Sequence, residues 1–250
     1  MINAPKISIV TVVYNDKKHL EKTIKSVINQ TYDNVEYIVI DGGSTDGAIN
    51  IIKKYESKIF HWVSESDNGI YDAMNKGINL ATGQWINFMN AGDIFYSSET
   101  LQEVFYNQQY EAEIIYGDYL ADHGYFTETV AAKNISQLWQ GMAFCHQSAF
   151  ISTQYHKKNK YSLRYSISGD FNFFYEAFQG GTRFQYFEKI VSIFACDGIS
   201  SVVGAGAGRQ NLRIINNYGY SIGHNFYYLF RFSYQIIKRF LNLFSFNHVK

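Results

Sequence analysis

The chain has few of the residues that break or crosslink a fold. Among its 250 residues there is one proline, Pro5, and no proline- or serine-rich linker that would mark a domain boundary. Its two cysteines, Cys145 and Cys196, lack the paired spacing of metal-binding or redox motifs. This pattern favours a reducing compartment over a disulfide scaffold, and we predict that both cysteines are core residues.

Segments that direct a protein into or across a membrane are also lacking. Residues 1–10 contain no basic stretch followed by an apolar run and a cleavage site, so no signal peptide is expected. The longest apolar runs are too short to span a bilayer. We therefore expect a cytoplasmic protein.

Acidic residues are absent from the end of the chain. Asp197 is the last one, whereas the whole chain has a formal net charge of zero, so the body carries a charge of about −6 and the end about +6. Such an asymmetry indicates an anionic partner for the end of the chain and gives no reason to expect nucleic acid at the body. The basic residues after Asp197 are Arg209, Arg213, Arg231, Lys238, Arg239 and Lys250.

We treat residues 204–250 as a C-terminal tail. It begins with a glycine-rich stretch, 204–208, which we expect to be irregular and to act either as a loop that closes over a diphosphate or as a hinge. In residues 226–244 the polar side chains recur mainly every three or four positions among Phe, Tyr, Leu and Ile. This spacing predicts a helix that lies in a membrane interface, peripheral on the inner face of the cytoplasmic membrane, or one that packs on the body or on another subunit.

The first 90 residues alternate between two kinds of pattern. Runs of β-branched and apolar residues predict buried strands, and the segments between them show apolar residues at helical spacing. Four strands alternating with three helices predict an α/β fold with a doubly wound, mostly parallel sheet. The predicted strands cover residues 6–13, 35–40, 59–63 and 85–89.

A polar loop follows each of these strands, and three of the loops carry an acid: Asp41, Asp67 and Asp93. Ligands collect beyond the carboxyl ends of parallel strands, so a shared polar or cationic ligand explains the three acids better than three separate helix caps. Asp93 follows a small, flexible turn and is the best-placed ligand for Mn²⁺ or Mg²⁺, to which Asn90 could add a neutral oxygen. The alternative is that Asp93 caps the helix predicted around Leu101.

The first loop argues against two other nucleotide-using classes. A dinucleotide-binding oxidoreductase would carry G-x-G-x-x-G after its first strand, where this chain has residues 14–18, Tyr-Asn-Asp-Lys-Lys. A nucleotidyltransferase needs a glycine-rich basic loop that cradles phosphates, and this segment does not provide one.

The second half is less regular. Residues 113–119 predict another strand, and residues 183–187 and 190–196 predict two closing strands. His146 lies in an aromatic stretch and is either a structural residue or one that contacts substrate.

Residues 5 to about 95 resemble the family 2 glycosyltransferases, which have the GT-A fold, and in particular the bacterial members associated with capsule, exopolysaccharide or O-antigen assembly. The shared motifs, in the order of the family, are PKISIVTVVYN, SVINQTY, EYIVIDGGSTDG, SESDNGIYDAMNKGI and ATGQWINFMNAGD. The resemblance implies a GT-A catalytic domain over residues 1–203. Residues 1–95 would bind the nucleotide sugar and residues 96–203 the acceptor.

The resemblance also implies a set of site residues. Tyr14 and Asn15 would line the nucleotide pocket, Asp41 and Asp67 would contact the nucleoside, and residues 90–93 would form the metal and diphosphate motif. The full set on the donor side is Tyr14, Asn15, Asp41, Asp67, Asn68, Lys76 and Asn90, with Asp93 as the metal ligand. Arg209 joins this set on a separate ground, because it lies beside the glycine-rich stretch that could close over a diphosphate.

Two departures from the family pattern affect this site. Many members carry consecutive acids after the second strand, where this chain has Asp41 followed by Gly42. Many also carry an acid-rich D-x-D-D, where this chain has Asn-Ala-Gly-Asp at 90–93 and therefore one carboxylate. Nucleotide choice and metal affinity are the properties that these departures affect.

The acceptor side contains one candidate base. Gly169 and Asp170 open an aromatic helix and resemble the Glu-Asp motif of the family, whose Asp is the general base. Asp170 could instead be an N-cap. We favour the base, because the chemistry requires a carboxylate near the acceptor hydroxyl.

These observations predict a metal-dependent, hexosyltransferase-like enzyme, and the resemblance implies that the reaction inverts the anomeric configuration. The enzyme would move a sugar from a nucleoside-diphosphate donor, with a UDP-sugar favoured, to a glycan or lipid-linked saccharide in surface polysaccharide synthesis. The alternative is a noncatalytic protein that binds nucleotide sugars and scaffolds a membrane-associated assembly complex.

Overall fold

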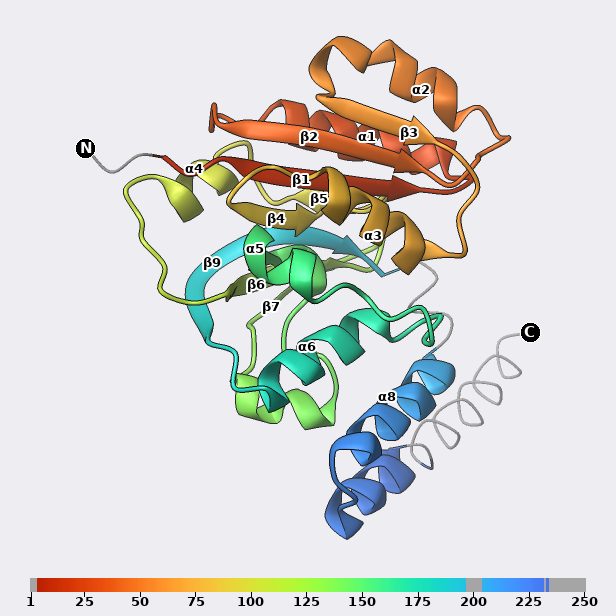
Figure 1. Ribbon diagram of the computed structural model, residues 1–250, viewed down its shortest axis with the longest axis vertical. Coiled ribbons are helices and arrows are strands. Elements are labelled where there is room, and N and C mark those ends of the chain that lie inside the picture. The colour runs from red at the N-terminus through yellow and green to blue at the C-terminus, as the bar shows by residue number, and fades with distance from the viewer. Residues whose placement is uncertain (1–3, 197–203, 232, 234–250) are drawn as a thin grey trace.

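The computed structural model describes residues 4–196, 204–231 and 233, which form a mixed β-sheet covered by helices on both faces (Figure 1). The strands are β1 (Ile7–Val13), β2 (Val35–Asp41), β3 (His61–Ser64), β4 (Trp85–Phe88), β5 (Ile94–Phe95), β6 (Ile114–Asp122), β7 (Thr127–Val130), β8 (Ala149–Ser152) and β9 (Phe184–Ala195). The α-helices are α1 (Lys17–Ile28), α2 (Ala48–Lys54), α3 (Ile70–Leu80), α4 (Thr100–Phe105), α5 (Thr153–Lys158), α6 (Gly169–Gln179) and α8 (Gly204–Tyr218), and residues 222–231 form a further helix. The short 3₁₀ helices are η1 (Glu56–Lys58), η2 (Ile135–Gln140) and η3 (His146–Ser148).

The sheet has a parallel half and a mixed half. Its strand order is β3-β2-β1-β4-β8-β6-β9-β5, with β7 paired to β6. The first four strands of this order are parallel, which confirms the predicted doubly wound arrangement, whereas β8 is antiparallel to both β4 and β6. Because β1 is central and all seven of its residues are buried, only an apolar, β-branched run suits this position. The carboxyl ends of β1, β2, β3 and β4 therefore meet at one edge.

The core consists of two layers, one on each face of the sheet. Successive side chains of a strand point to opposite faces, so Ile9 packs in the layer with α1, α2 and α4, while Val10 packs in the layer with α3 and α6. Gly77 allows α3 to lie directly on β1, because a Cβ atom at this position would overlap the side chain of Val10. The polar loops at the strand ends are thereby fixed to a rigid sheet.

The closing part of the sheet differs from the prediction. The two segments predicted as separate strands, residues 183–187 and 190–196, form one continuous strand, β9. Its pairing with β6 shifts register around Gly117, where a Cβ atom would lie 2.6 Å from the Lys189 carbonyl oxygen. The polar interruption at residues 188–189 is therefore a β-bulge and not a strand end.

The glycine-rich stretch 204–208 also differs from the prediction, because it is helical and begins α8. Glycine disfavours a helix by only about 1 kcal/mol per residue, and packing outweighs this cost. Ile214 and Ile215 of α8 are fully buried, and the Gln210 side chain accepts a backbone hydrogen bond from Ser168 at 3.2 Å. The segment is thus neither the loop nor the hinge that the sequence suggested.

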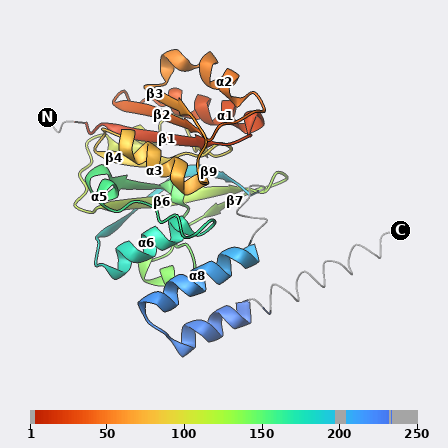
Figure 2. The same ribbon diagram turned by 45° about the vertical axis from the view of Figure 1, so that its right-hand side comes forward.

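The helix at 222–231 turns back along α8, and the two form a hairpin below α6 (Figure 2). Residues 232 and 234–250, which include most of the helix predicted over 226–244, lie outside the described residues. Of the helices that the structure describes, none combines the length and the apolar character needed to cross a membrane.

Candidate active site

The loops that follow β1 and β2 are bonded to each other at the carboxyl edge of the sheet. The Asn15 backbone N–H donates to the Ser44 hydroxyl at 2.8 Å, and the Asn15 side-chain oxygen accepts from the Thr45 backbone N–H at 2.8 Å. Asn15 has a φ of 50°, which is a left-handed conformation that asparagine adopts more readily than most residues. The structure therefore brings these two predicted loops together.

Asp41 is fully buried at the end of β2 and organises its own loop. Its Oδ2 atom accepts hydrogen bonds from the backbone of Gly43 at 3.2 Å and of Ser44 at 3.0 Å, and from the Ser64 hydroxyl at 2.6 Å. Its Oδ1 atom is buried and has no hydrogen-bond partner among the described residues. As placed, Asp41 ties the β2 loop to β3, and a direct contact with the nucleoside stays a prediction.

Tyr14, Gly42 and Asp67 form an open corner of the site. The Tyr14 ring is 65% exposed. A Cβ atom at Gly42 would overlap the Asp67 carboxylate and would lie 3.4 Å from the Tyr14 ring. A side chain directly after the Asp of β2, such as the acid of the family pattern, would therefore meet the carboxylate of Asp67, from the loop after β3. An exposed aromatic face beside a carboxylate can stack on a base and accept its N–H groups.

Gly42→Ala is expected to weaken nucleoside diphosphate binding about fivefold. The added methyl group displaces the Asp67 carboxylate, and one lost hydrogen bond costs about 1 kcal/mol. Calorimetric titration with UDP and GDP measures the effect. Gly180→Ala is the matched control, because its Cβ atom would meet only backbone carbonyl oxygens of α6, that of Glu176 at 3.2 Å and that of Ala177 at 3.6 Å. Equal affinities for the wild type and a folded Gly42→Ala variant would remove Asp67 from the nucleoside site.

Asn68 and Lys76 support the loop after β3. The Lys76 ammonium group lies 2.9 Å from the Glu65 carboxylate and donates to the Ser66 carbonyl at 3.0 Å. The Asp72 carboxylate accepts from the backbone and side-chain N–H groups of Asn68, at 2.9 and 3.3 Å. Both residues hold the segment that carries Asp67, and their contact with the donor stays a prediction.

Asp93 lies in the turn between β4 and β5 and does not cap a helix, because the N-cap residue of α4 is Glu99. Its Oδ2 atom accepts from the Gln147 amide at 2.5 Å, and its Oδ1 atom accepts from the Ala195 backbone N–H at 3.3 Å. Gly92, with a φ of 104°, provides the left-handed residue that the turn requires. The turn after β4, the helix η3 and the end of β9 therefore converge on one carboxylate.

Gln147 is a site residue that the sequence did not reveal. Its amide oxygen accepts a hydrogen bond from the Cys145 thiol at 2.7 Å, which orients its NH₂ group towards Asp93. Burial, together with the negative charge of Asp93, raises the pKa of Cys145 well above its usual value, so the thiol stays a neutral donor. Cys145 and Cys196 are both only half-buried, so the prediction that they are core residues was wrong.

Asp170 lies in the first turn of α6. The N-cap residue of this helix is Ser168, so Asp170 is not the cap. Its Oδ1 atom lies 3.0 Å from the Tyr71 hydroxyl, and its Oδ2 atom lies 3.6 Å from Nδ1 of His146. Burial alone would raise the pKa of Asp170, but the interactions with His146, the Phe171 backbone and Tyr71 lower it below its ordinary value. The carboxylate is therefore ionised at neutral pH.

His146 connects the acceptor side of the site to the donor side. Its Nε2 atom lies 3.2 Å from the Asn90 side-chain nitrogen, which donates to it, and this leaves the ring proton on Nδ1, towards Asp170. One imidazole ring thus separates the turn of Asp93 from the candidate base. The structure places His146 among polar site residues, which favours a functional over a purely structural role.

Gly169 gives space to an aromatic ring from another helix. A Cβ atom at Gly169 would lie 2.7 Å from the ring of Tyr71, which extends from α3. The Tyr71 hydroxyl lies 2.5 Å from the Ile167 carbonyl oxygen and also contacts Asp170. Burial and the charge of Asp170 raise the pKa of Tyr71, so it stays protonated. The ring therefore occupies the space of the first acid in the Glu-Asp motif, and its hydroxyl binds the second.

Arg209 is an exposed residue of α8. The next residue, Gln210, accepts backbone hydrogen bonds from Ile167 at 3.4 Å and Ser168 at 3.2 Å, directly before Asp170. Arg209 thus belongs to the helical turn that lies against the start of α6. Its contact with a diphosphate stays a prediction.

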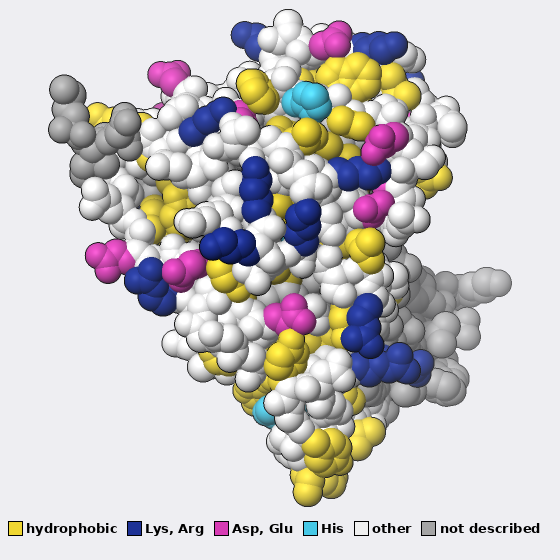
Figure 3. All heavy atoms as spheres, in the orientation of Figure 1, with side chains coloured by type: hydrophobic (Ala, Val, Ile, Leu, Met, Phe, Trp, Pro, Cys, Tyr) yellow, Lys and Arg dark blue, Asp and Glu magenta, His cyan; other side chains and the backbone are white. Residues whose placement is uncertain are grey.

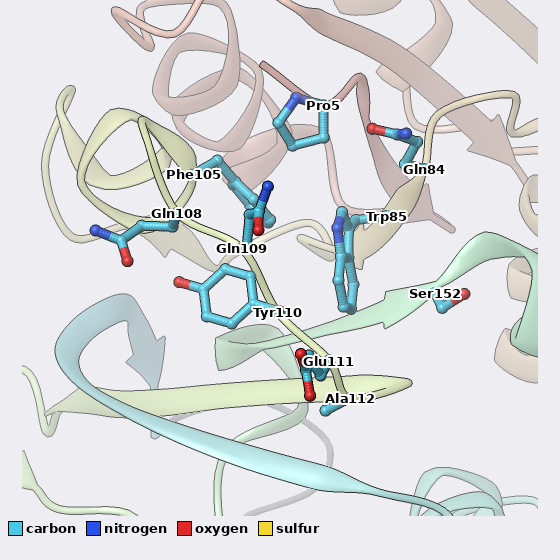
Figure 4. Close-up of a pocket in the computed structure, with 10 residues that line it drawn as sticks. All are labelled: Pro5, Gln84, Trp85, Phe105, Gln108, Gln109, Tyr110, Glu111, Ala112 and Ser152. Atoms are coloured by element: carbon cyan, nitrogen blue, oxygen red, sulfur yellow. The ribbon is translucent and has the colours of Figure 1, made fainter. Parts of the chain in front are cut away.

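A hollow of about 760 Å³ lies at the opposite edge of the sheet (Figure 4). Pro5 and Gln84, which line it, directly precede the strands at their amino ends, and the side chains of Trp85 and Tyr110 form much of its wall. The acids described above follow the carboxyl ends of the same strands. The hollow is therefore separate from the candidate active site.

The candidate metal site has one carboxylate. Among the described residues no group of three or more His, Cys, Asp or Glu side chains could hold a metal ion. Each oxygen of Asp93 accepts a protein hydrogen bond, and the side-chain oxygen of Asn90 is buried without a hydrogen-bond partner among those residues. This donor set fits a Mg²⁺ or Mn²⁺ ion that takes its other ligands from phosphates and water.

Comparison with known proteins is consistent with this geometry. The family model described as "Glycosyl transferase family 2" matches residues 8–190. The chain belongs to glycosyl transferase family 2. It is thus a glycosyltransferase, and the resemblance inferred from its motifs is confirmed.

This glycosyltransferase has similar relatives in mycobacteria. It is 32% identical over 178 residues to a "PGL/p-HBAD biosynthesis glycosyltransferase" of Mycobacterium bovis (strain BCG / Pasteur 1173P2), with 68% of each chain covered. It is 43% identical over 96 residues to an uncharacterized glycosyltransferase of Mycobacterium tuberculosis (strain CDC 1551 / Oshkosh), which covers 38% of this chain and 37% of that protein.

Solved structures share the fold. TarS 1-349 of S. aureus in complex with UDP-GlcNAc has a TM-score of 0.66 at 17% identity, covering 88% of this chain and 69% of the other. The mannosyltransferase PcManGT from Pyrobaculum calidifontis, in complex with GDP-Man and Mn²⁺, has a TM-score of 0.69 at 14% identity, covering 89% and 67%. These similarities confirm the predicted GT-A fold.

Proposed function

We propose that this glycosyltransferase transfers a sugar from a UDP-sugar to a hydroxyl group of a glycan or lipid-linked saccharide in surface polysaccharide synthesis, by one displacement that inverts the anomeric centre. The observation that carries the proposal is the pair of contacts that His146 makes, with Asn90 through its Nε2 atom and with Asp170 through its Nδ1 atom. It links the turn of the candidate metal ligand to the candidate base at the carboxyl edge of the sheet.

The donor would lie across the loops of β1 to β4. Tyr14 and Asp67 offer a stacking face and a carboxylate for the nucleoside, and the diphosphate would extend towards Asp93 and Asn90. A bound Mg²⁺ or Mn²⁺ would neutralise charge on the departing diphosphate. That similar structures hold UDP-GlcNAc or GDP-Man supports a nucleotide-sugar donor.

Asp170 would remove the proton from the acceptor hydroxyl. Inversion by a single displacement requires the base and the leaving group to lie on opposite sides of the anomeric carbon. Asp170 lies at one nitrogen atom of the His146 ring and Asn90 at the other. The ring therefore lies between the candidate base and the turn that would hold the leaving group. The Tyr71 hydroxyl fixes the other oxygen of the base.

Nucleoside diphosphate release from a panel of UDP-, GDP- and TDP-sugars tests the proposal. The assay contains saccharide and lipid-linked saccharide acceptors, with Mn²⁺, Mg²⁺ or a chelator. Release from a UDP-sugar that requires both the metal and an acceptor is the expected result. Metal-dependent donor binding by calorimetry, without release from any donor, would instead support the noncatalytic scaffold.

A further inference from the structure

The helix at 222–231 exposes a continuous apolar face. Ile222, Phe226, Leu229 and Phe230 are 58–75% exposed and follow one another at helical spacing, so they share one side of the helix. Tyr218, the last residue of α8, and Tyr220, in the turn that follows it, are also exposed. Figure 3 shows hydrophobic side chains gathered at the lower tip of the molecule, where Figure 1 places this turn. We call these six residues the aromatic face.

The other side of the same helix is fixed to the body. Tyr228 is fully buried, and the ring of His224 stacks on that of Trp139 at a centroid distance of 4.4 Å. The Arg231 side chain donates to the Gln140 carbonyl oxygen at 2.6 Å. The helix therefore cannot rotate to bury the aromatic face without losing these contacts.

The charge within residues 204–231 has one sign, although one acid from outside this segment, Glu176 of α6, contacts Tyr218 of the aromatic face. Residues 204–231 contain Arg209, Arg213 and Arg231, all exposed, and no acid. Lys and Arg side chains lie beside α8 in Figure 3. The sequence after this helix, residues 232–250, adds only basic residues to this charge. A second copy of the chain would bring like charges together, whereas anionic headgroups complement them.

We propose that the aromatic face docks on the surface of an anionic lipid bilayer, such as the inner face of the cytoplasmic membrane. Tyrosine and phenylalanine side chains would enter the boundary between headgroups and acyl chains, and Arg209 and Arg213 would contact headgroups. The 15 residues of α8 span about 20 Å and begin against the segment before Asp170. The bilayer would thus lie within reach of the site, and this docking does not require the transfer reaction.

Co-sedimentation of the full chain with vesicles tests the proposal. Vesicles of phosphatidylcholine with phosphatidylglycerol are compared with vesicles of phosphatidylcholine alone, without donor or acceptor. The wild type is expected to bind the anionic vesicles. Phe226→Gln combined with Phe230→Gln should lower the partition coefficient about 100-fold, because each buried aromatic side chain contributes a factor of about ten or more. The matched control combines Phe60→Gln with Tyr125→Gln, two exposed aromatic residues elsewhere, and should bind like the wild type.

A second variant tests the charge. Arg209→Gln combined with Arg213→Gln should lower binding to the anionic vesicles about fivefold per residue and leave binding to the neutral vesicles unchanged. The proposal would be overturned if the wild-type protein stayed in the supernatant. It would also be overturned if the Phe226→Gln, Phe230→Gln variant and its control lost vesicle binding equally. If the wild type were a dimer that bound no vesicles, and the Phe226→Gln, Phe230→Gln variant were a monomer, the partner of the aromatic face would be a second copy of the chain. Because vesicle binding is measured apart from activity, its failure leaves the proposed reaction standing.

Discussion

Asp170→Asn is expected to lower kcat by a factor of about 10² to 10⁴ while leaving the affinity for the donor unchanged. The substitution preserves the shape of the side chain and an oxygen for the Tyr71 hydroxyl, but it removes the group that takes the acceptor proton. Steady-state kinetics give the turnover, and calorimetric titration with the nucleoside diphosphate gives the affinity.

Glu176→Gln, which removes an exposed carboxylate from the same helix, is the matched control and should retain wild-type turnover. The pH profile provides a second readout. Since the folded structure lowers the pKa of Asp170, the ionised base is present above that lowered value. The acid limb of kcat is expected below the usual range of a carboxyl group and should be absent from Asp170→Asn. Wild-type turnover in the variant would exclude Asp170 as the base.

Asp93→Ala is expected to abolish metal-dependent donor binding and to reduce turnover by about 10³ or more. A bound metal contributes several kcal/mol to stabilising the departing diphosphate, and each 1.36 kcal/mol is a factor of ten in rate. The substitution also leaves the Gln147 amide and the Ala195 N–H without their acceptor. Asp93→Asn, which keeps an oxygen at this position, separates the loss of charge from the loss of these hydrogen bonds.

Calorimetry with UDP, with and without Mn²⁺, measures the metal dependence of binding, and the release assay measures turnover. The control is Asp118→Asn, because Asp118 is equally buried and accepts from the Ala132 backbone and the Tyr186 hydroxyl. It should keep the metal dependence even if its stability is lower. If Asp93→Asn binds UDP with the full effect of Mn²⁺, Asp93 is not a metal ligand.

The parallel half of the fold and the position of the main candidates could be predicted from the sequence. Buried parallel strands need long apolar, β-branched runs, and such runs have few other uses in a soluble domain. An acid at the end of such a run, as at Asp41, or in the short loop after it, as at Asp93, falls at the ligand-binding edge. Asp170 could be located because Gly169 and Asp170, at the start of an aromatic helix, resemble the Glu-Asp motif of the family.

Residues that enter the site through tertiary contacts gave no such signal. Gln147 and Asp93 are 54 positions apart, and Tyr71 and Asp170 are 99 apart, so no local pattern connects them. The glycines at 204–208 led to a wrong prediction in another way. Glycine does disfavour a helix, but packing against α6 outweighs this preference and the segment is helical. Local patterns therefore located the strand-end acids, while the side chains that hold them depended on the three-dimensional arrangement.

The contact between Gly169 and Tyr71 restricts the order in which these two positions can change during evolution. Any side chain at 169 meets the ring at 71, so regaining the acid of the Glu-Asp pair first requires a smaller residue at 71. That first step removes the hydroxyl group that contacts Asp170. The resulting variant has neither the tyrosine hydroxyl nor the neighbouring acid beside Asp170. The two positions are expected to covary among homologues, with glycine at 169 accompanied by tyrosine at 71, and to show epistasis when they are exchanged singly.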